Sequence, residues 1–276
     1  MNLHLALLAA VAASVVALPA GAVDLPTDPA FDKPAEVRHV RLGPAQTKPV
    51  TYKEIRCSYF AGIMIKEWDE QEIGDKEISY VPAPGSAKPP CQKASLPGER
   101  KLPVSDLTVY FLGYAGGAIF LGDADGANGT IGFFVFDPKS GKQRFTDTTK
   151  LDSKFASIAN DSGTLKLGYV RALTGPCSVV TDGADCWPKF VQQSGYTGAA
   201  PDCVAGYKQA AESFAADVCK AQGGDQNKCL ADQLARRADW DKTPSVVAFD
   251  VTASISPDNT AAVTPTGGPA QCWPSD

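Results

Sequence analysis

The stretch Phe133-Phe134-Val135-Phe136-Asp137-Pro138-Lys139-Ser140-Gly141-Lys142 joins an aromatic run to a turn. Aromatic and β-branched residues favour strands, and a turn with proline early and glycine late is typical of a β-hairpin. This stretch therefore predicts that the chain folds by antiparallel pairing of neighbouring strands.

Short β-rich runs of the same kind recur along the chain, separated by turn signals. The runs expected to form strands are 54–60, 63–68, 77–81, 108–114, 118–121, 131–137, 165–171 and 246–253. Many short strands without helices between them are typical of antiparallel sheets. The predicted fold class is therefore mainly β, an antiparallel β-sandwich or barrel-like body with a disulfide-clamped two-helix insertion near the C-terminus.

A β-propeller is the alternative all-β architecture. The phrase Val135-Phe136-Asp137 followed by Ser140-Gly141-Lys142 resembles one that recurs in propeller blades. It occurs once in this chain, and no repeat of about 40 to 50 residues accompanies it. The sandwich or barrel is therefore preferred.

Residues 202–240 carry the helical insertion. Apolar residues recur at spacings of three and four from Val204 to Val218, after Asp202, which can cap a helix. Gly223 and Gly224 end this first helix. Asp225 can cap a second one that stops before Pro244, so the two helices are expected to form a hairpin.

All eight cysteines follow residue 22, and an even number in an exported chain predicts disulfides. If Cys203 and Cys219 share one helix, about 24 Å separates them, far more than the roughly 7 Å that a disulfide spans. They therefore cannot pair with each other. The preferred pairing is Cys57 with Cys91, Cys177 with Cys186, Cys203 with Cys272, and Cys219 with Cys229.

The chain divides into three predicted regions. Residues 1–22 contain no acidic or basic side chain other than His4, and their apolar run ends in Pro19 and small residues, as in a secretory signal peptide. Residues 23–50 carry five prolines and are expected to be an extended leader. Residues 51–276 are expected to form a single mainly β domain, which includes the helical hairpin 202–240 and a tail, 256–276, anchored by a disulfide.

Composition excludes several functions. The chain has 26 Lys and Arg residues and 31 Asp and Glu residues, which gives a net charge of -5. Because basic residues are not in excess, a nucleic acid is not expected as a partner. After signal cleavage no segment is long enough to span a membrane. The remaining chain has one histidine, His39, which excludes most Ser/His/Asp, Cys/His and multi-histidine chemistry and is expected to be a solvated residue. Cysteine metal sites are disfavoured because exported thiols oxidise.

The loop 122–129 contains the candidate metal ligands Asp123, Asp125 and Asn128. Carboxylate and amide oxygens on a glycine-rich turn are ligands that Ca²⁺ prefers, although the spacing departs from the EF-hand pattern. Asp, Asn and Gly clusters also form plain tight turns. Calcium is therefore the one candidate cofactor, and the preferred interpretation is a turn without metal.

The segment Glu67-Trp68-Asp69-Glu70-Gln71-Glu72, followed by Asp75 and Glu77, is the second acidic feature. In a strand, Glu67 and Asp69 share a face, and close carboxylates can split their pKa values as glycosidases require. The preferred interpretation is a solvated hairpin edge whose charges oppose aggregation.

The tripeptide Cys-Trp-Pro occurs at 186–188 and 272–274. A tryptophan beside a disulfide usually packs on the sulfur, and the alternative is a pair of exposed rings that stack on a sugar or another ligand. The chain is predicted to be exported, periplasmic or extracellular, and to bind a protein or a glycan without catalysis. A histidine-independent hydrolase or lyase acting on carbohydrate is the alternative, and a structural or envelope role is not separable from binding.

Overall fold

The computed structural model describes residues 28–45, 51–85, 88–104, 108–124, 126–237 and 239–275. The predicted signal peptide, residues 1–22, lies outside the described residues, as do 23–27 and 46–50 of the predicted leader. The described chain is mainly antiparallel β, with three α-helices, which confirms the predicted fold class.

The first sheet is an antiparallel meander of five consecutive strands. They are β1 (Glu36–Pro44), β2 (Tyr52–Phe60), β3 (Gly62–Asp69), β4 (Glu77–Ala83) and β5 (Arg100–Lys101). Residues 54–60, 63–68 and 77–81 were each predicted as strands, and their alternating or continuous apolar residues account for this.

The second sheet has nine strands in the order β13-β12-β11-β9-β8-β7-β6, with β10 beside β11 and β14 beside β12. They are β6 (Val109–Ala115), β7 (Ala118–Asp123), β8 (Thr130–Phe136), β9 (Gln143–Lys150), β10 (Ser157–Asp161), β11 (Thr164–Thr174), β12 (Ser245–Ile255), β13 (Ala261–Pro265) and β14 (Gln271–Pro274). The chain returns through β12 after the helices, so residues 165–174 pair with 246–255.

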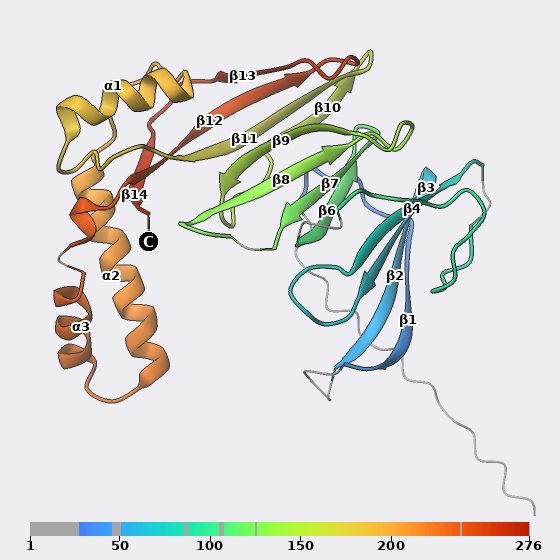
Figure 1. Cartoon of the computed structure of the whole chain (residues 1–276), viewed down its shortest axis with the longest axis horizontal. Helices are drawn as coiled ribbons and strands as arrows, with labels where there is room; N and C mark the ends of the chain where they lie inside the picture. The colour runs from blue at the N-terminus through green and yellow to red at the C-terminus, as the bar shows by residue number, and fades with distance from the viewer. Residues whose placement is uncertain are drawn as a thin grey trace, which may run out of the picture.

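The two sheets pack on each other through part of their faces. Ile65 and Tyr80 of the first sheet belong to one buried cluster with Ile119, Leu121 and Phe136 of the second. The opposite face of the second sheet forms a larger cluster that is covered by α1 (Gly183–Ser194) and by residues near the N-terminus. Figure 1 shows the first sheet and the long helices at opposite ends of the molecule.

The segment before β1 contacts both sheets, and within the predicted leader residues 36–44 form an extended edge strand. Asp28 accepts a hydrogen bond from the Phe155 amide at 2.7 Å, and the Phe31 ring lies 5.2 Å from that of Phe120. Residues 36–44 then pair with β2 as an edge strand. Prolines disfavour a helix or a central strand, and β1 is accordingly an edge strand that ends at Pro44.

The outer face of the first sheet is covered by the segment between β4 and β5. The disulfide Cys57–Cys91 fixes this segment to β2. Lys66 and Glu99 form an ion pair at 2.5 Å in which each side chain is 3% exposed. A buried cation is costly unless it is paired, so Glu99 stabilises a lysine that points away from solvent.

The helical hairpin consists of α2 (Cys203–Gln222) and α3 (Gln226–Ala235), with the predicted caps Asp202 and Asp225, and a 3₁₀ turn (Trp240–Lys242) follows it. The buried row of α2 differs from the predicted apolar stripe. Its members are Cys203, Tyr207, Ala215 and Cys219, whereas Val204 is 66% exposed. The two disulfides of α2 select this row, because each cysteine must face its partner.

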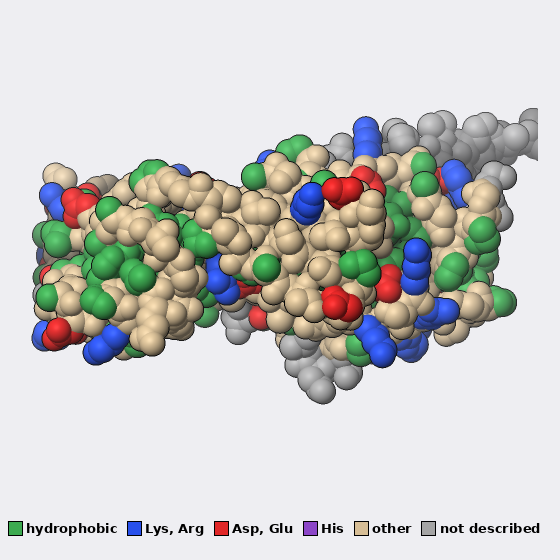
Figure 2. All heavy atoms as spheres, turned by 90° about the horizontal axis from the view of Figure 1, so that it is seen from above, with side chains coloured by type: hydrophobic (Ala, Val, Ile, Leu, Met, Phe, Trp, Pro, Cys, Tyr) green, Lys and Arg blue, Asp and Glu red, His purple; other side chains and the backbone are tan. Residues whose placement is uncertain are grey.

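Four disulfides link the eight cysteines in the pairing that the sequence analysis preferred: Cys57–Cys91, Cys177–Cys186, Cys203–Cys272 and Cys219–Cys229. Such a set points to an oxidising, exported environment. Hydrophobic side chains gather over the end of the molecule that carries the helices, and around the first sheet Lys and Arg side chains lie among Asp and Glu (Figure 2).

Candidate functional site

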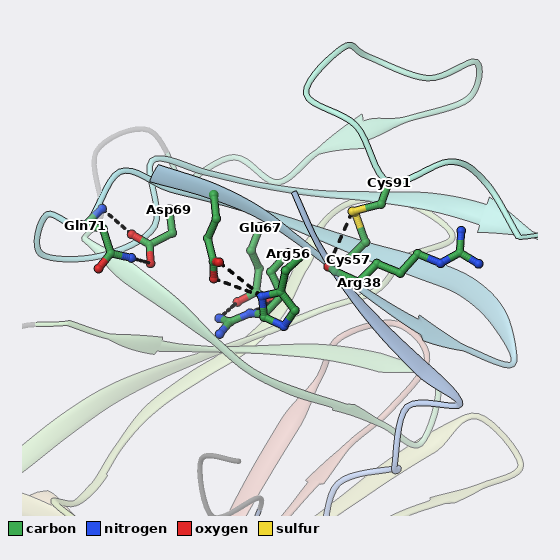
Figure 3. A network of polar contacts seen from close by, with 9 residues as sticks. Arg38, Arg56, Cys57, Glu67, Asp69, Gln71 and Cys91 are labelled. Atoms are coloured by element: carbon green, nitrogen blue, oxygen red, sulfur yellow. Dashed lines mark hydrogen bonds and ion pairs between the residues drawn. A yellow bond between two sulfur atoms is a disulfide. The ribbon is translucent and has the colours of Figure 1, made fainter. Parts of the chain in front are cut away.

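The predicted acidic edge is the first place where the structure assembles charged side chains. Glu67 lies directly opposite Arg56 in the register of β2 and β3, and Arg56 in turn lies opposite His39 of β1. Arg56 Nε donates to Glu67 Oε2 at 2.9 Å, and its Nη2 donates to Oε1 (Figure 3). The Glu67 side chain is 1% exposed, so the expectation of a solvated edge is wrong for this residue.

The neighbouring residues behave differently. Asp69 turns toward the following loop, where it accepts hydrogen bonds from the backbone and side-chain amides of Gln71 (Figure 3). His39 Nδ1 lies 3.3 Å from the carboxylate of Glu54 and sits on a strand rather than in a solvated tail. The acidic run is therefore divided between a buried pair and a surface turn.

Asp75 completes the buried group from the loop after β3. Its amide donates to Val109 O at 2.7 Å, and its carboxylate faces the Phe111 amide at 3.4 Å, so it contacts the edge of β6 in the second sheet. Burial raises the pKa of Asp75 to about 8, and the nearby charge of Glu67 adds to this rise while Arg56 opposes it. Burial also raises the pKa of Glu67, against the hydrogen bond from Arg56.

This arrangement couples the two sheets and does not resemble an accessible catalytic pair. The Arg56 guanidinium binds Glu67 through two nitrogens, and its charge also acts on the nearby buried Asp75. Asp75 is 8% exposed. A glycosidic substrate must reach both carboxylates, and these two lie inside the contact between the sheets.

The predicted calcium loop follows β7. Asp123 is the last residue of β7, and Asn128 lies in the left-handed region with a φ of 59° before the turn that leads to β8. Asp125 lies outside the described residues. Within the described part of the chain, no group of three His, Cys, Asp or Glu side chains is placed to hold a metal ion. The calcium site stays a prediction.

The same loop has another contact that the sequence did not indicate. The Asn128 carbonyl accepts a hydrogen bond from Trp273 Nε1 at 2.8 Å. Gly129 follows with a φ of +70°, and a Cβ there would lie 2.8 Å from the same nitrogen. The glycine-rich loop therefore approaches the indole closely and fixes its orientation.

The two Cys-Trp-Pro tryptophans have different surroundings. Trp187, in α1, stacks on Phe190 at 5.4 Å and packs against the large core cluster. Trp273, in β14, is half-buried and lines a groove. Both rings are half-buried against buried clusters, and Trp273 is the one that lines the groove, so it is the better match to an aromatic platform for a ligand.

The groove, of about 580 Å³, runs between α2 and β14. Trp273 and Gln271 contribute one wall, and Gln209 and Ser213 of α2 contribute polar groups to the other. Lys150, from the end of β9, places its ammonium 5.7 Å from the centroid of the Trp273 ring. The groove therefore combines an aromatic ring, two amides, a hydroxyl and a cation.

Close packing at its base keeps the groove in shape. The disulfide Cys203–Cys272 joins the first turn of α2 to β14. Gly206 lies against this strand so closely that a Cβ would come within 1.9 Å of the Cys272 carbonyl oxygen. Both walls are therefore fixed before a ligand arrives, which lowers the ordering cost of binding.

A second, smaller groove of about 290 Å³ lies at the tip of the helical hairpin. It is lined by polar and charged residues such as Asp225, Lys228 and Arg236, together with Cys229. It contains no aromatic residue in the described lining, and so the larger groove is the better candidate for a ligand site.

Comparison of the chain with models of protein families, with curated proteins and with solved structures gives no match. Among the helices that the structure describes, none combines the length and the apolarity needed to cross a membrane. The described chain is a disulfide-stabilised, mainly β protein, and its four disulfides are consistent with an exported domain.

Proposed function

We propose that this protein is exported through the signal peptide at residues 1–22 and binds a glycan, without catalysis, in the groove between α2 and β14. The observation that carries the proposal is Trp273, whose ring borders the groove while its Nε1 is held by the Asn128 carbonyl. A ring fixed in this way is a platform on which the apolar face of a sugar can stack.

The other lining residues support a sugar rather than an apolar ligand. Gln209, Gln271 and Ser213 offer amide and hydroxyl groups that both donate and accept hydrogen bonds, as sugar hydroxyls do. The groove volume lies within the range of about 300 to 1,000 Å³ that is typical of small-ligand sites. The groove has few polar groups, and a small number of polar groups in a ligand site serves mainly to fix the orientation of the ligand.

The carboxylate content of the groove fits a binding role better than a catalytic role. Asp202 is the one carboxylate in the described lining, and it accepts the Ala205 amide at 3.0 Å as the cap of α2. Hydrolysis of a glycosidic bond ordinarily requires two carboxyl groups on either side of that bond. The groove therefore lacks the pair among its described residues.

The experiment is a glycan-array screen followed by calorimetry with the oxidised protein. Trp273→Ala is expected to abolish binding, and Trp273→Phe, which keeps a ring, is expected to retain much of it. Tyr52→Ala is the control, because it removes a 46% exposed ring on the first sheet, far from the groove. Equal binding by the wild type and Trp273→Ala contradicts the proposal, as does the absence of any glycan ligand.

A carboxylate-based hydrolase or lyase acting on carbohydrate is the second candidate; Asp75 and Glu67 have the raised pKa values of catalytic acids, but their burial between the sheets opposes this role. A catalytic pair gives a bell-shaped pH profile of turnover. Incubation with polysaccharides over a range of pH, followed by reducing-end analysis, separates the two candidates. Turnover that Asp75→Asn or Glu67→Gln abolishes, without unfolding, supports the enzyme, and no turnover at any pH supports the binding protein.

A further inference from the structure

Lys150 gives the groove a charge preference. It is the one cation in the described lining, and its Nζ lies 2.6 Å from the side-chain oxygen of Gln271. None of the ion pairs within the described ranges includes Lys150. The neutral amide of Gln271 thus positions the Lys150 ammonium. One of the three ammonium protons is directed to the amide oxygen.

The position of this ammonium relative to the ring defines what it can bind. Lys150 Nζ lies over the Trp273 ring, 5.7 Å from its centroid, and so borders the space in which a sugar ring would stack. A pyranose carries its exocyclic C6 group at the rim of the ring. A carboxylate at that position can accept hydrogen bonds from Nζ while the ring stays on the indole, and charge-assisted hydrogen bonds are about twice as strong as neutral ones.

Resting on the proposed glycan-binding function, we infer that the groove selects a carboxylated sugar, whose ring stacks on Trp273 and whose carboxylate binds Lys150. Gln271 positions the lysine by its amide oxygen and contributes no competing charge. Asp202 lies on the α2 wall, where its carboxylate is engaged with the Ala205 amide at the helix cap. In this arrangement Lys150 provides the specificity for a carboxylate, and Trp273 provides the surface on which the sugar ring stacks.

The test compares two probes with the same sugar rings, tetragalacturonate and its methyl ester, in which each carboxylate is either free or esterified, by calorimetry at low ionic strength. The wild type is expected to bind the acid about tenfold or more tightly than the ester. Lys150→Gln is expected to remove this preference, so that the variant binds the acid and the ester with similar affinity. Lys166→Gln is the matched control, since it removes a lysine that pairs with Asp161 elsewhere on the second sheet, and it should keep the preference.

The outcomes separate the inference from the function on which it rests. If the wild type binds both probes equally, or if Lys150→Gln keeps the preference for the acid, the carboxylate inference is wrong and glycan binding stands. If neither probe nor any glycan of the array binds, and Trp273→Ala changes nothing, the proposed function itself is wrong.

Discussion

Asp75→Asn tests how charge is balanced between the two sheets. The substitution keeps a side-chain oxygen that can accept the Phe111 amide and removes the ionisable group. In the folded protein the pKa of Asp75 lies at about 8, raised from its ordinary value of 3.8 first by burial and then by the charge of Glu67. The folded state therefore holds this proton over a pH range in which the unfolded chain has released it.

The sign and the size of the effect follow from linkage. Between pH 3.8 and about 8 the folded state binds more protons at Asp75 than the unfolded state does, so the free energy of unfolding falls as pH rises. The slope is at most about 1.4 kcal/mol for each pH unit, and over the window the loss is on the order of 5 kcal/mol. The Asp75→Asn variant carries no such loss, because its side-chain amide does not ionise.

The assay is chemical denaturation of the oxidised wild type and of Asp75→Asn at pH 4.5, 6, 7 and 8.5. The two proteins are expected to have similar stability at the lowest pH, and the variant should become more stable by several kcal/mol at the highest. Carboxylates with a lowered pKa, such as Glu70 beside Lys76, act in the opposite direction, so the difference between the proteins is the informative quantity. Asp161→Asn, in an exposed ion pair, is the control and should differ by less than about 1 kcal/mol.

A stability difference that does not change with pH would refute this reasoning. So would a variant that is less stable than the wild type throughout, because that result would mean that the charged carboxylate stabilises the contact with β6.

Three further predictions concern stability. Gly206→Ala should lower stability by about 1 to 3 kcal/mol, measured by denaturation, because its Cβ would lie 1.9 Å from the Cys272 carbonyl oxygen, and an unchanged midpoint would contradict the close packing. Replacing Cys219 and Cys229 together by Ser should cost about 2 to 3 kcal/mol while the β circular dichroism persists, whereas loss of the β signal would place the hairpin in the core. Chelation with EDTA should leave the melting temperature unchanged if the loop 123–128 binds no calcium, and a fall of several degrees would establish the metal site.

Much of the fold follows from local pattern in the sequence. The runs that become β2, β3, β4, β6, β7, β8, β11 and β12 contain enough apolar residues to be predicted as strands. The strands that were not predicted are polar, such as β9 with its sequence QRFTDTTK, or short and exposed, such as β10 and β13. These strands pair with strands adjacent in sequence, but they contain few buried apolar side chains, so neither an apolar run nor a clear alternation marks them. The helix α1 was missed because Pro188 lies inside it.

The candidate sites show the same limit. Glu67 is one member of an acidic run in the sequence, and only the strand register places it against Arg56 and away from water. Trp273 was singled out by the repeated Cys-Trp-Pro. Its partners Lys150 and Gln209 come from β9 and α2 and were not predicted. The predicted disulfide Cys203–Cys272 places α2 beside β14, but the packing of these elements determines which of their side chains line the groove.

The binding account is tested most directly by titrating the oxidised protein with a glycan identified on the array. The NMR signals of the indole N–H groups are the readout of this titration. The chain has four tryptophans, and Trp68 and Trp187 lie outside the described groove lining. We predict that the glycan shifts the signal of Trp273 at saturating concentration and leaves those of Trp68 and Trp187 in place. A glycan that binds without shifting the Trp273 signal would contradict the account.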